Sequence, residues 1–282
     1  MRSTPTLLGE QGFSLVEMLV ATAIVSTVLA AVGTLFAVSR GFMQDQILLV
    51  ETQQGLRSTL ESMARDLRLG GACLPITGDF VVLDGTDSAT TDSITTRTGL
   101  VRPNLSCIST TLTAAMSKTT TTLTVGTTDG FSPGMRALIR HAGNGTGESF
   151  TILTVTPPNT LTKAGGWAQD YPKDSGVYAA DERTYSVDTT TDPLLPMLTV
   201  TANGNAPSAF AYGIENLTIK YLLNRNCPPC DIVDAPAPAD NQWRMVNEIL
   251  ITATARSRSA ARNGQYIRLT GSISAKPRNL LP

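Results

Sequence analysis

The stretch GEQGFSLVEMLVATAIVSTVLAAVGTLFAVSR, residues 9–40, decides how the chain begins. Between Phe13 and Ser39 the only ionisable side chain is Glu17, and no proline interrupts the apolar run. The run predicts one continuous helix about 40 Å long, which exceeds the roughly 30 Å hydrocarbon core of a bilayer. A carboxylate in such a helix costs about 2.5–3.5 kcal/mol on insertion scales, so it normally has a partner.

Three interpretations of this run compete: a cleaved secretory signal, a plain membrane anchor, and a segment that uses its carboxylate. A secretory signal has an apolar region of about 7–15 residues. The run here is nearly twice as long and carries an acid near its start, although Ala37-Val38-Ser39 could pass for a cleavage site. A plain anchor fits the length but leaves Glu17 without an explanation.

The segment GFSLVEML, residues 12–19, resembles the processing motif of type IV prepilins and of type II secretion pseudopilins. In that family a short leader ends in glycine, phenylalanine begins the mature chain, and glutamate is its fifth residue. Gly12, Phe13 and Glu17 hold those places. The resemblance implies cleavage between Gly12 and Phe13 by a prepilin peptidase, with N-methylation of Phe13. The leader departs from the family in having Arg2 as its only basic residue.

The resemblance also implies a partner for Glu17. Cleavage creates a positive amine on Phe13, and in the family the glutamate of one subunit neutralises the terminal amine of its neighbour. Opposite charges attract strongly where the dielectric is low, and either one alone is penalised. We expect this pair to set the register between subunits. In an unassembled subunit, Glu17 could instead snorkel to the membrane interface.

The helix is predicted to continue beyond the apolar run as far as Leu69, where Gly70-Gly71 would end it. An apolar stripe lies within about 60° of one helical face. Its members are Phe42, Leu49, Leu56, Leu60, Met63 and Leu67. The stripe predicts that this second half of the helix lies on a sheet.

The C-terminal region supplies such a sheet. The segments NLTIKYLL (216–223), NEILITATAR (247–256) and YIRLTGSIS (266–274) predict three antiparallel strands, of which the middle one is the most buried. Residues 119–165 alternate short Thr/Val/Ile strands with Gly, Asn and Pro turns, and they predict an inserted small β module. The fold class is therefore expected to be α+β, with a long helix packed on an antiparallel sheet.

The order of segments extends the resemblance. MARDLRLGG (63–71), GIENLTIKYLL (213–223) and NEILITATARS (247–257) are similar to segments of PilW-like minor pilins and of the J-type pseudopilins. This implies a type IV pilin fold. The expected division is a leader (1–12), a membrane-spanning and fibre-core helix (13–40), an amphipathic half-helix (41–71) and a β-rich domain outside the cytoplasm (72–282).

The four cysteines are Cys73, Cys107, Cys227 and Cys230. A domain outside the cytoplasm favours disulfides, and three connectivities are open. We expect Cys73–Cys107 and a local Cys227–Cys230 clip, with crossed pairing as the alternative. The CPPC segment leads into a Pro-rich loop with no helix to lower a thiol pKa, so structural bridges are favoured over redox activity. A single C-x-x-C also argues against a zinc site.

No other pattern indicates chemistry. The 22 basic and 23 acidic residues nearly cancel, so no nucleic-acid partner is inferred. His141 is expected on a surface loop, and Asp84, Asp87 and Asp92 are expected in a solvated turn, since they lack the spacing of a calcium loop. No hydrolase, P-loop or zinc-protease signature is present, so the sequence predicts neither an enzyme nor a cofactor.

The predicted function is that of a minor pilin, a non-enzymatic subunit that helps to start or cap a type IV pilus. Its expected partners are other major and minor pilins, the prepilin peptidase and the inner-membrane assembly platform. Its N-terminus would be cytoplasmic and its domain periplasmic, then on the cell surface. The alternatives are a J-type pseudopilin, a pilus-tip adhesin that binds through residues 76–200, and an anchored redox protein.

Overall fold

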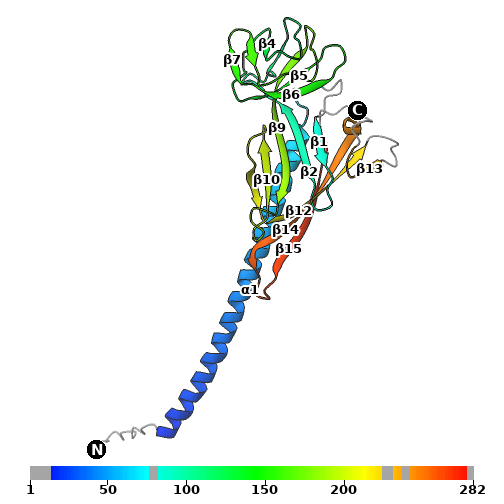
Figure 1. Ribbon diagram of the computed structural model, residues 1–282. Coiled ribbons are helices and arrows are strands. Elements are labelled where there is room, and N and C mark those ends of the chain that lie inside the picture. Colours follow the sequence, from blue (N-terminus) through cyan, green and yellow to red (C-terminus); the bar gives the residue numbers. More distant parts are fainter. Residues whose placement is uncertain (1–13, 76–81, 224–230, 237–241, 278–282) are drawn as a thin grey trace, which may run out of the picture.

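A single long helix carries the β-structure at one end (Figure 1). The computed structural model describes residues 14–75, 82–223, 231–236 and 242–277. Helix α1 runs from Leu15 to Leu69 and is about 80 Å long. It ends as predicted, because Gly70 donates its N–H to the Leu67 carbonyl at 3.2 Å and Gly71 follows with φ +79°.

The burial of α1 changes along its length. Residues 14–40 are exposed throughout, and the buried face begins at Thr52. The members of this buried face are Thr52, Leu56, Thr59, Leu60, Met63, Ala64 and Leu67. Four residues of the predicted stripe are therefore confirmed. The prediction for Phe42 was wrong: its side chain is 60% exposed, because only the tip of one hairpin reaches that level, through Arg262.

The buried face of α1 packs on a four-stranded antiparallel sheet with the order β13-β12-β14-β15. Three of its strands are those predicted from the sequence. Leu217, Ile219 and Tyr221 point into the core from β12, as their alternation predicts. The strands are β12 (Ile214–Leu223), β13 (Asp231–Val233), β14 (Val246–Ala260) and β15 (Tyr266–Ala275), and a 3₁₀ turn, Gln242–Met245, leads into β14.

A second, larger sheet adjoins this layer. Its main path is β1-β2-β9-β10-β11, while β3 and β5 also pair with β9, and β6 pairs with β5. All these pairings are antiparallel. The strands are β1 (Leu83–Thr86), β2 (Ser93–Gly99), β3 (Ser109–Thr111), β5 (Arg136–Arg140), β6 (Gly147–Thr151), β9 (Gly176–Asp188), β10 (Met197–Ala202) and β11 (Ser208–Tyr212).

The distal end of the molecule has a hydrophobic core of its own. Strands β4 (Thr122–Thr124), β7 (Thr154–Thr156) and β8 (Thr160–Thr162) form a small sheet there. Phe150, Leu161 and Trp167 lie in this core, and Val177 and Ala179 enter it from β9. The core therefore draws on residues beyond 119–165, and β9 continues from it into the core beneath α1, where Tyr185 lies. The predicted fold class, α+β with a long helix on an antiparallel sheet and a smaller β module, is confirmed.

Candidate functional site: the exposed apolar helix and its carboxylate

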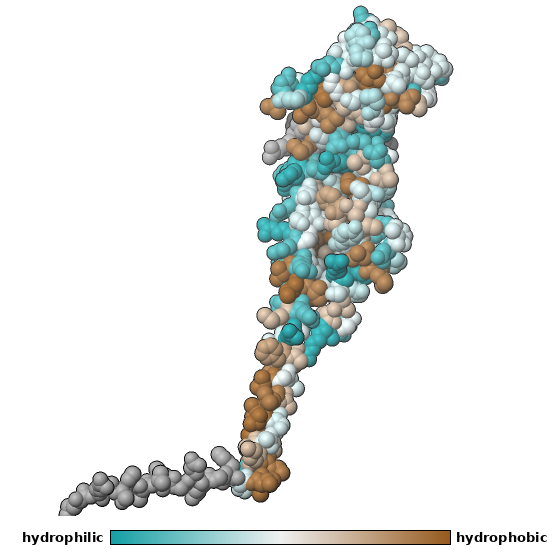
Figure 2. Space-filling model, turned by 90° about the vertical axis from the view of Figure 1, so that its left-hand side faces the viewer, coloured by the Kyte–Doolittle hydropathy of each residue, from teal (hydrophilic) through white to brown (hydrophobic). Residues whose placement is uncertain are grey.

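The first half of α1 is an exposed apolar surface. Figure 2 shows it as a hydrophobic stem below the domain. Its exposed large side chains include Leu15, Val16, Met18, Leu19, Ile24, Val25, Val28, Leu29, Leu35 and Phe36. Apolar patches larger than a few hundred Å² mark contact with a membrane or another protein. By length and composition alone, α1 could span a membrane: an 18-residue window has a mean hydropathy of 2.2, and none of it is buried.

Four hydroxyl groups on this surface, those of Thr22, Ser26, Thr27 and Thr34, donate within the helix. Thr22 Oγ1 donates to the Met18 carbonyl at 3.0 Å, and Thr27 Oγ1 donates to the Ala23 carbonyl at 2.8 Å. Thr34 Oγ1 donates in the same way to a carbonyl of the preceding turn. Such back-bonding lowers the need of these hydroxyls for water, so the surface suits apolar surroundings.

Glu17 is the exception on this surface. Its carboxylate accepts the backbone N–H of Ser14, with 3.0 Å between N and Oε2, and within the described residues it has no cationic partner. Carboxylates are favourable near helix N-termini, where the unsatisfied N–H groups carry partial positive charge. Gly12 and Phe13 lie outside the described residues, so the cleavage junction and the pairing of Glu17 with a terminal amine stay predictions.

Beyond the end of α1, a disulfide joins Cys73 to Cys107 with 5.4 Å between the Cα atoms. The predicted pairing of these two cysteines is therefore present. It ties the end of the helix to the segment that leads into β3. Cys227 and Cys230 lie outside the described residues, so their clip stays a prediction.

The expectation of a solvated turn was wrong for Asp92. This residue is 5% exposed, and its carboxylate accepts the N–H of Ile219 at 2.7 Å and the N–H of Ser88 at 3.1 Å. Asp92 thus fastens the β1–β2 turn to β12, a contact between residues distant in sequence. Among the residues that the structure describes, no group of three or more His, Cys, Asp or Glu side chains is placed to hold a metal ion.

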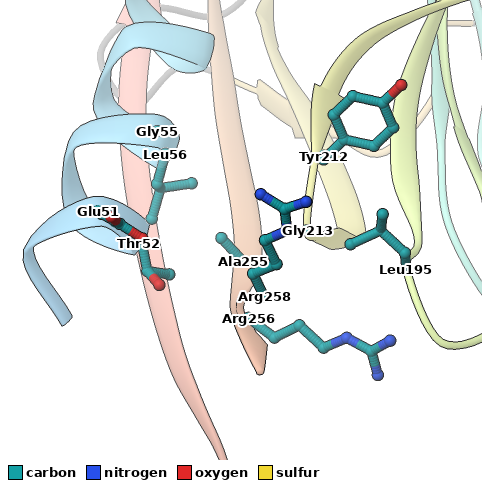
Figure 3. A pocket seen from close by; sticks show the side chains of 10 residues that line it. All are labelled: Glu51, Thr52, Gly55, Leu56, Leu195, Tyr212, Gly213, Ala255, Arg256 and Arg258. Atoms are coloured by element: carbon teal, nitrogen blue, oxygen red, sulfur yellow. The ribbon is translucent and has the colours of Figure 1, made fainter. Parts of the chain in front are cut away.

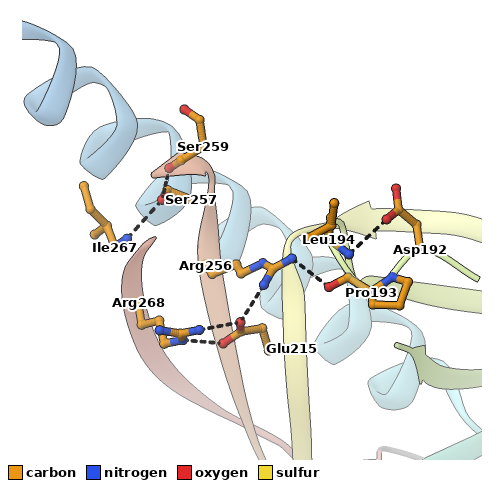
Figure 4. Close-up of polar contacts among 9 residues, drawn as sticks. All are labelled: Asp192, Pro193, Leu194, Glu215, Arg256, Ser257, Ser259, Ile267 and Arg268. Carbon is orange, nitrogen blue, oxygen red and sulfur yellow. Dashed lines mark hydrogen bonds and ion pairs between the residues drawn. The ribbon is translucent and has the colours of Figure 1, made fainter. Parts of the chain in front are cut away.

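A groove of about 510 Å³ lies where α1 passes β14 (Figure 3). It is lined by Glu51, Thr52, Gly55 and Leu56 of α1, by Leu195, Tyr212 and Gly213, and by Ala255, Arg256 and Arg258 of β14. Arg256, in one wall, belongs to a network of ion pairs, as Figure 4 shows. Glu215 binds Arg256 at 3.4 Å and Arg268 at 2.8 Å, while Arg256 donates to the Pro193 carbonyl at 3.1 Å. The sequence did not predict this network, because its members lie on three separate strands and in one loop, and no local pattern joins them.

Comparison with known proteins locates the functional signal at the N-terminus. Residues 8–33 match the family model of the prokaryotic N-terminal methylation motif. The chain carries a prepilin-type N-terminus. The match spans the predicted Gly12–Phe13 junction and Glu17, and it supports membrane anchoring of this prepilin-type chain and a structural role of the pilin or pseudopilin kind. Such a role implies contact with other pilins and with a prepilin peptidase.

The remaining comparisons are more distant. No curated protein matches the chain. Among solved structures, a type IV-like pilin from Thermus thermophilus aligns at TM-score 0.37 and 13% identity, over 81% of this chain and 98% of that one. A tailspike of Acinetobacter baumannii bacteriophage AP22, solved with a capsular saccharide, aligns at TM-score 0.24 and 14% identity, over 30% of this chain and 15% of the tailspike. Both TM-scores lie below 0.5, so neither similarity establishes a shared function.

Proposed function

We propose that the chain is a minor pilin, a non-enzymatic subunit of a type IV pilus. One observation carries the proposal. A helix that bears the methylation motif presents a long, fully exposed apolar surface with a single carboxylate, Glu17, in its first turn. Such a surface is stable only in a bilayer or against other apolar helices.

The mechanism is packing. A peptidase cleaves between Gly12 and Phe13, and the helix stays inserted in the inner membrane with the β-domain on the periplasmic side. The assembly platform then moves the helix from the bilayer into a bundle of neighbouring helices, and the domain comes to lie on the fibre surface. Glu17 meets the terminal amine of a neighbouring subunit during this transfer. A J-type pseudopilin of type II secretion would use the same steps, and the genes beside this one distinguish the two.

Intact-mass measurement of the protein purified from the membranes of its own host tests the processing. We expect a chain that begins at Phe13 and carries one N-methyl group. A mass that corresponds to a start at Met1, or to a start near Gly41 as after a secretory cleavage, would contradict the proposal. A Gly12→Val variant, whose side chain obstructs the junction, should retain the leader and serves as the control.

A further inference from the structure

Strand β15 ends the four-stranded sheet, and nothing in the described chain pairs with its outer edge. Two contacts fix which residues face outward. Ser274 offers its carbonyl to Arg68 of α1 at 3.1 Å, so it points away from β14. Ile267 turns its N–H toward Ser257 of β14 at 3.0 Å (Figure 4). In an antiparallel pair these orientations alternate along the strand.

The side chains agree with this assignment. Thr270 and Thr254 touch through their hydroxyls at 3.1 Å, and Ser272 and Thr252 do so at 2.9 Å. Such close cross-strand contacts are typical of the pairs that do not share ladder hydrogen bonds. The N–H and C=O groups of Arg268, Thr270 and Ser272 therefore point outward, and none of them has a partner among the described residues.

The outer edge is also open to approach. Natural proteins protect edge strands with proline, bulges or a covering element. Strand β15 contains no proline, and its register with β14 is regular from Arg268 to Ala275. A row of unpaired backbone groups on a strand of this length is a template for a further strand.

A groove of about 450 Å³ runs beside this edge, between β15 and α1. Leu56 and Leu60 of α1 and Leu269 and Ile273 of β15 give it an apolar floor. Gly271 lies in the middle of the floor, and a Cβ atom there would come within 3.1 Å of Leu56. A strand added to β15 would direct every second side chain into this groove.

A cationic side chain lies at one end of the groove. Arg57 and Glu61 line the groove, and Arg68 follows beyond its end, where it donates to the Ser274 carbonyl. Glu61 neutralises Arg57, with 2.8 Å between Oε1 and Nε. Arg68 has no carboxylate partner within the described residues. This end of the groove therefore favours a partner that brings a carboxylate.

A second copy of β15 does not fit the edge. Strand β15 runs in the same direction as α1, because Gly271 adjoins Leu56 and Leu60 while Ser274 adjoins Arg68 further along the helix. Two β15 strands paired about a twofold axis would be antiparallel, so their helices would point in opposite directions. Two chains anchored in one membrane by their N-terminal helices, as the proposed function requires, cannot adopt that arrangement.

We propose that the β15 edge docks an extended segment of a different protein by strand addition. The segment carries apolar side chains at alternate positions, which fill the groove beside α1, and a carboxylate that meets Arg68. Backbone hydrogen bonds to Arg268, Thr270 and Ser272 supply affinity, and the groove supplies specificity. The surface is separate from the apolar stem, so docking extends the proposed function without using Glu17.

The test uses the full chain in nanodiscs and a labelled peptide of alternating valine and glutamate, about six residues long. Fluorescence anisotropy measures binding. Thr270→Pro removes one outward N–H but leaves the bonds to β14, because proline is tolerated where its missing N–H faces outward. Thr270→Val changes the same side chain and keeps that N–H. We expect Thr270→Val to bind like the wild type, and Thr270→Pro to bind about tenfold more weakly or worse.

A second pair of variants keeps the test independent of backbone changes. Arg68→Glu should weaken binding of the valine–glutamate peptide, whereas Lys173→Glu, at an exposed charge in the distal part of the chain, should not. Equal binding to the wild type and to both Thr270→Pro and Arg68→Glu would place the peptide away from the β15 edge and overturn the proposal. Failure of the wild type to bind, or pairing of wild-type chains that Thr270→Pro abolishes, would also overturn it. None of these results affects the mass measurement that tests processing. Failure of the docking proposal can therefore be told apart from failure of the proposed pilin function.

Discussion

The carboxylate of Asp66, near the end of α1, binds the guanidinium of Arg183 on β9, with 2.8 Å between Oδ2 and Nη1. The same oxygen accepts a hydrogen bond from the hydroxyl of Tyr185, whose side chain is fully buried. Asp181 binds Arg183 from the other side at 2.8 Å. The helix is thus joined to the large sheet by a polar contact as well as through the four-stranded sheet.

Replacing Asp66 with alanine should lower the free energy of unfolding by about 1–3 kcal/mol, because the buried Tyr185 hydroxyl loses its acceptor. Urea unfolding measures the change. The double variant Asp66→Ala/Tyr185→Phe removes both partners and should recover part of the lost stability. Together with the two single variants it forms a double-mutant cycle, which gives the interaction energy between Asp66 and Tyr185. An unchanged midpoint for Asp66→Ala would contradict the assigned contact.

Stability should decline at alkaline pH. Burial raises the pKa values of Tyr171, Tyr185 and Tyr221, and neighbouring carboxylates raise them further. In the unfolded chain these tyrosines ionise near pH 10, while in the folded chain they stay neutral. Their contribution to the free energy of unfolding is complete below about pH 10 and is lost progressively as the pH rises above it. Urea midpoints across this range should fall more gently for Tyr185→Phe than for the wild type; parallel curves would refute the role of Tyr185.

Two methionines of α1 form a matched pair. Met63 is fully buried under the four-stranded sheet, whereas Met43 is 66% exposed. Met63→Ala should cost about 2–5 kcal/mol of stability through lost burial and a residual cavity. Met43→Ala should change it by no more than about 0.5 kcal/mol. Thermal unfolding of both variants in the same detergent checks the difference, and equal effects would mean that α1 is not packed as described.

Loss of the Cys73–Cys107 disulfide should lower stability by about 2–4 kcal/mol, since the bridge closes a long loop of the unfolded chain. Unfolding of the Cys73→Ser/Cys107→Ser variant with and without reductant measures this. Reductant should destabilise the wild type more than the variant, which retains Cys227 and Cys230. If reductant destabilised the variant more than the wild type, the main stabilising disulfide would be the one between Cys227 and Cys230.

Glu17→Ala should leave cleavage and membrane insertion intact and impair incorporation into fibres with partner pilins. Glu17→Gln keeps an acceptor for the Ser14 N–H and removes only the charge, so it should be impaired as well if the partner is a terminal amine. Immunoblots of sheared fibres and of membranes measure the two steps separately. Normal incorporation of Glu17→Gln would refute the charge pair.

Periodicity and local pattern were sufficient to predict α1, its end at Leu69 and the three C-terminal strands, because each signal lies within a short run of residues. Contacts between distant segments could not be predicted in this way. Asp92 was expected in solvent, yet it is buried by β12, which is more than a hundred residues away. Phe42 fits the apolar stripe perfectly, but whether it is covered depends on how far the β14–β15 hairpin extends.

The same limit applies to the candidate site. The methylation motif is local, so Gly12, Phe13 and Glu17 could be proposed from the sequence, and the family match covers all three. The open edge of β15 is a property of the sheet order. The alternation of YIRLTGSIS predicts a strand, but it does not indicate which strand of the sheet lies last.

Strand β9 has a mechanical consequence. It is a single strand of 13 residues that passes from the distal core, at Val177, to the core beneath α1, at Tyr185. A force applied to the distal end therefore travels along one backbone, through ladders to β2 and β10, and reaches α1 at Asp66. A force along a strand is shared by many hydrogen bonds at once. We therefore expect a pulling force on the distal end to be transmitted to α1 before any single strand of the domain unfolds.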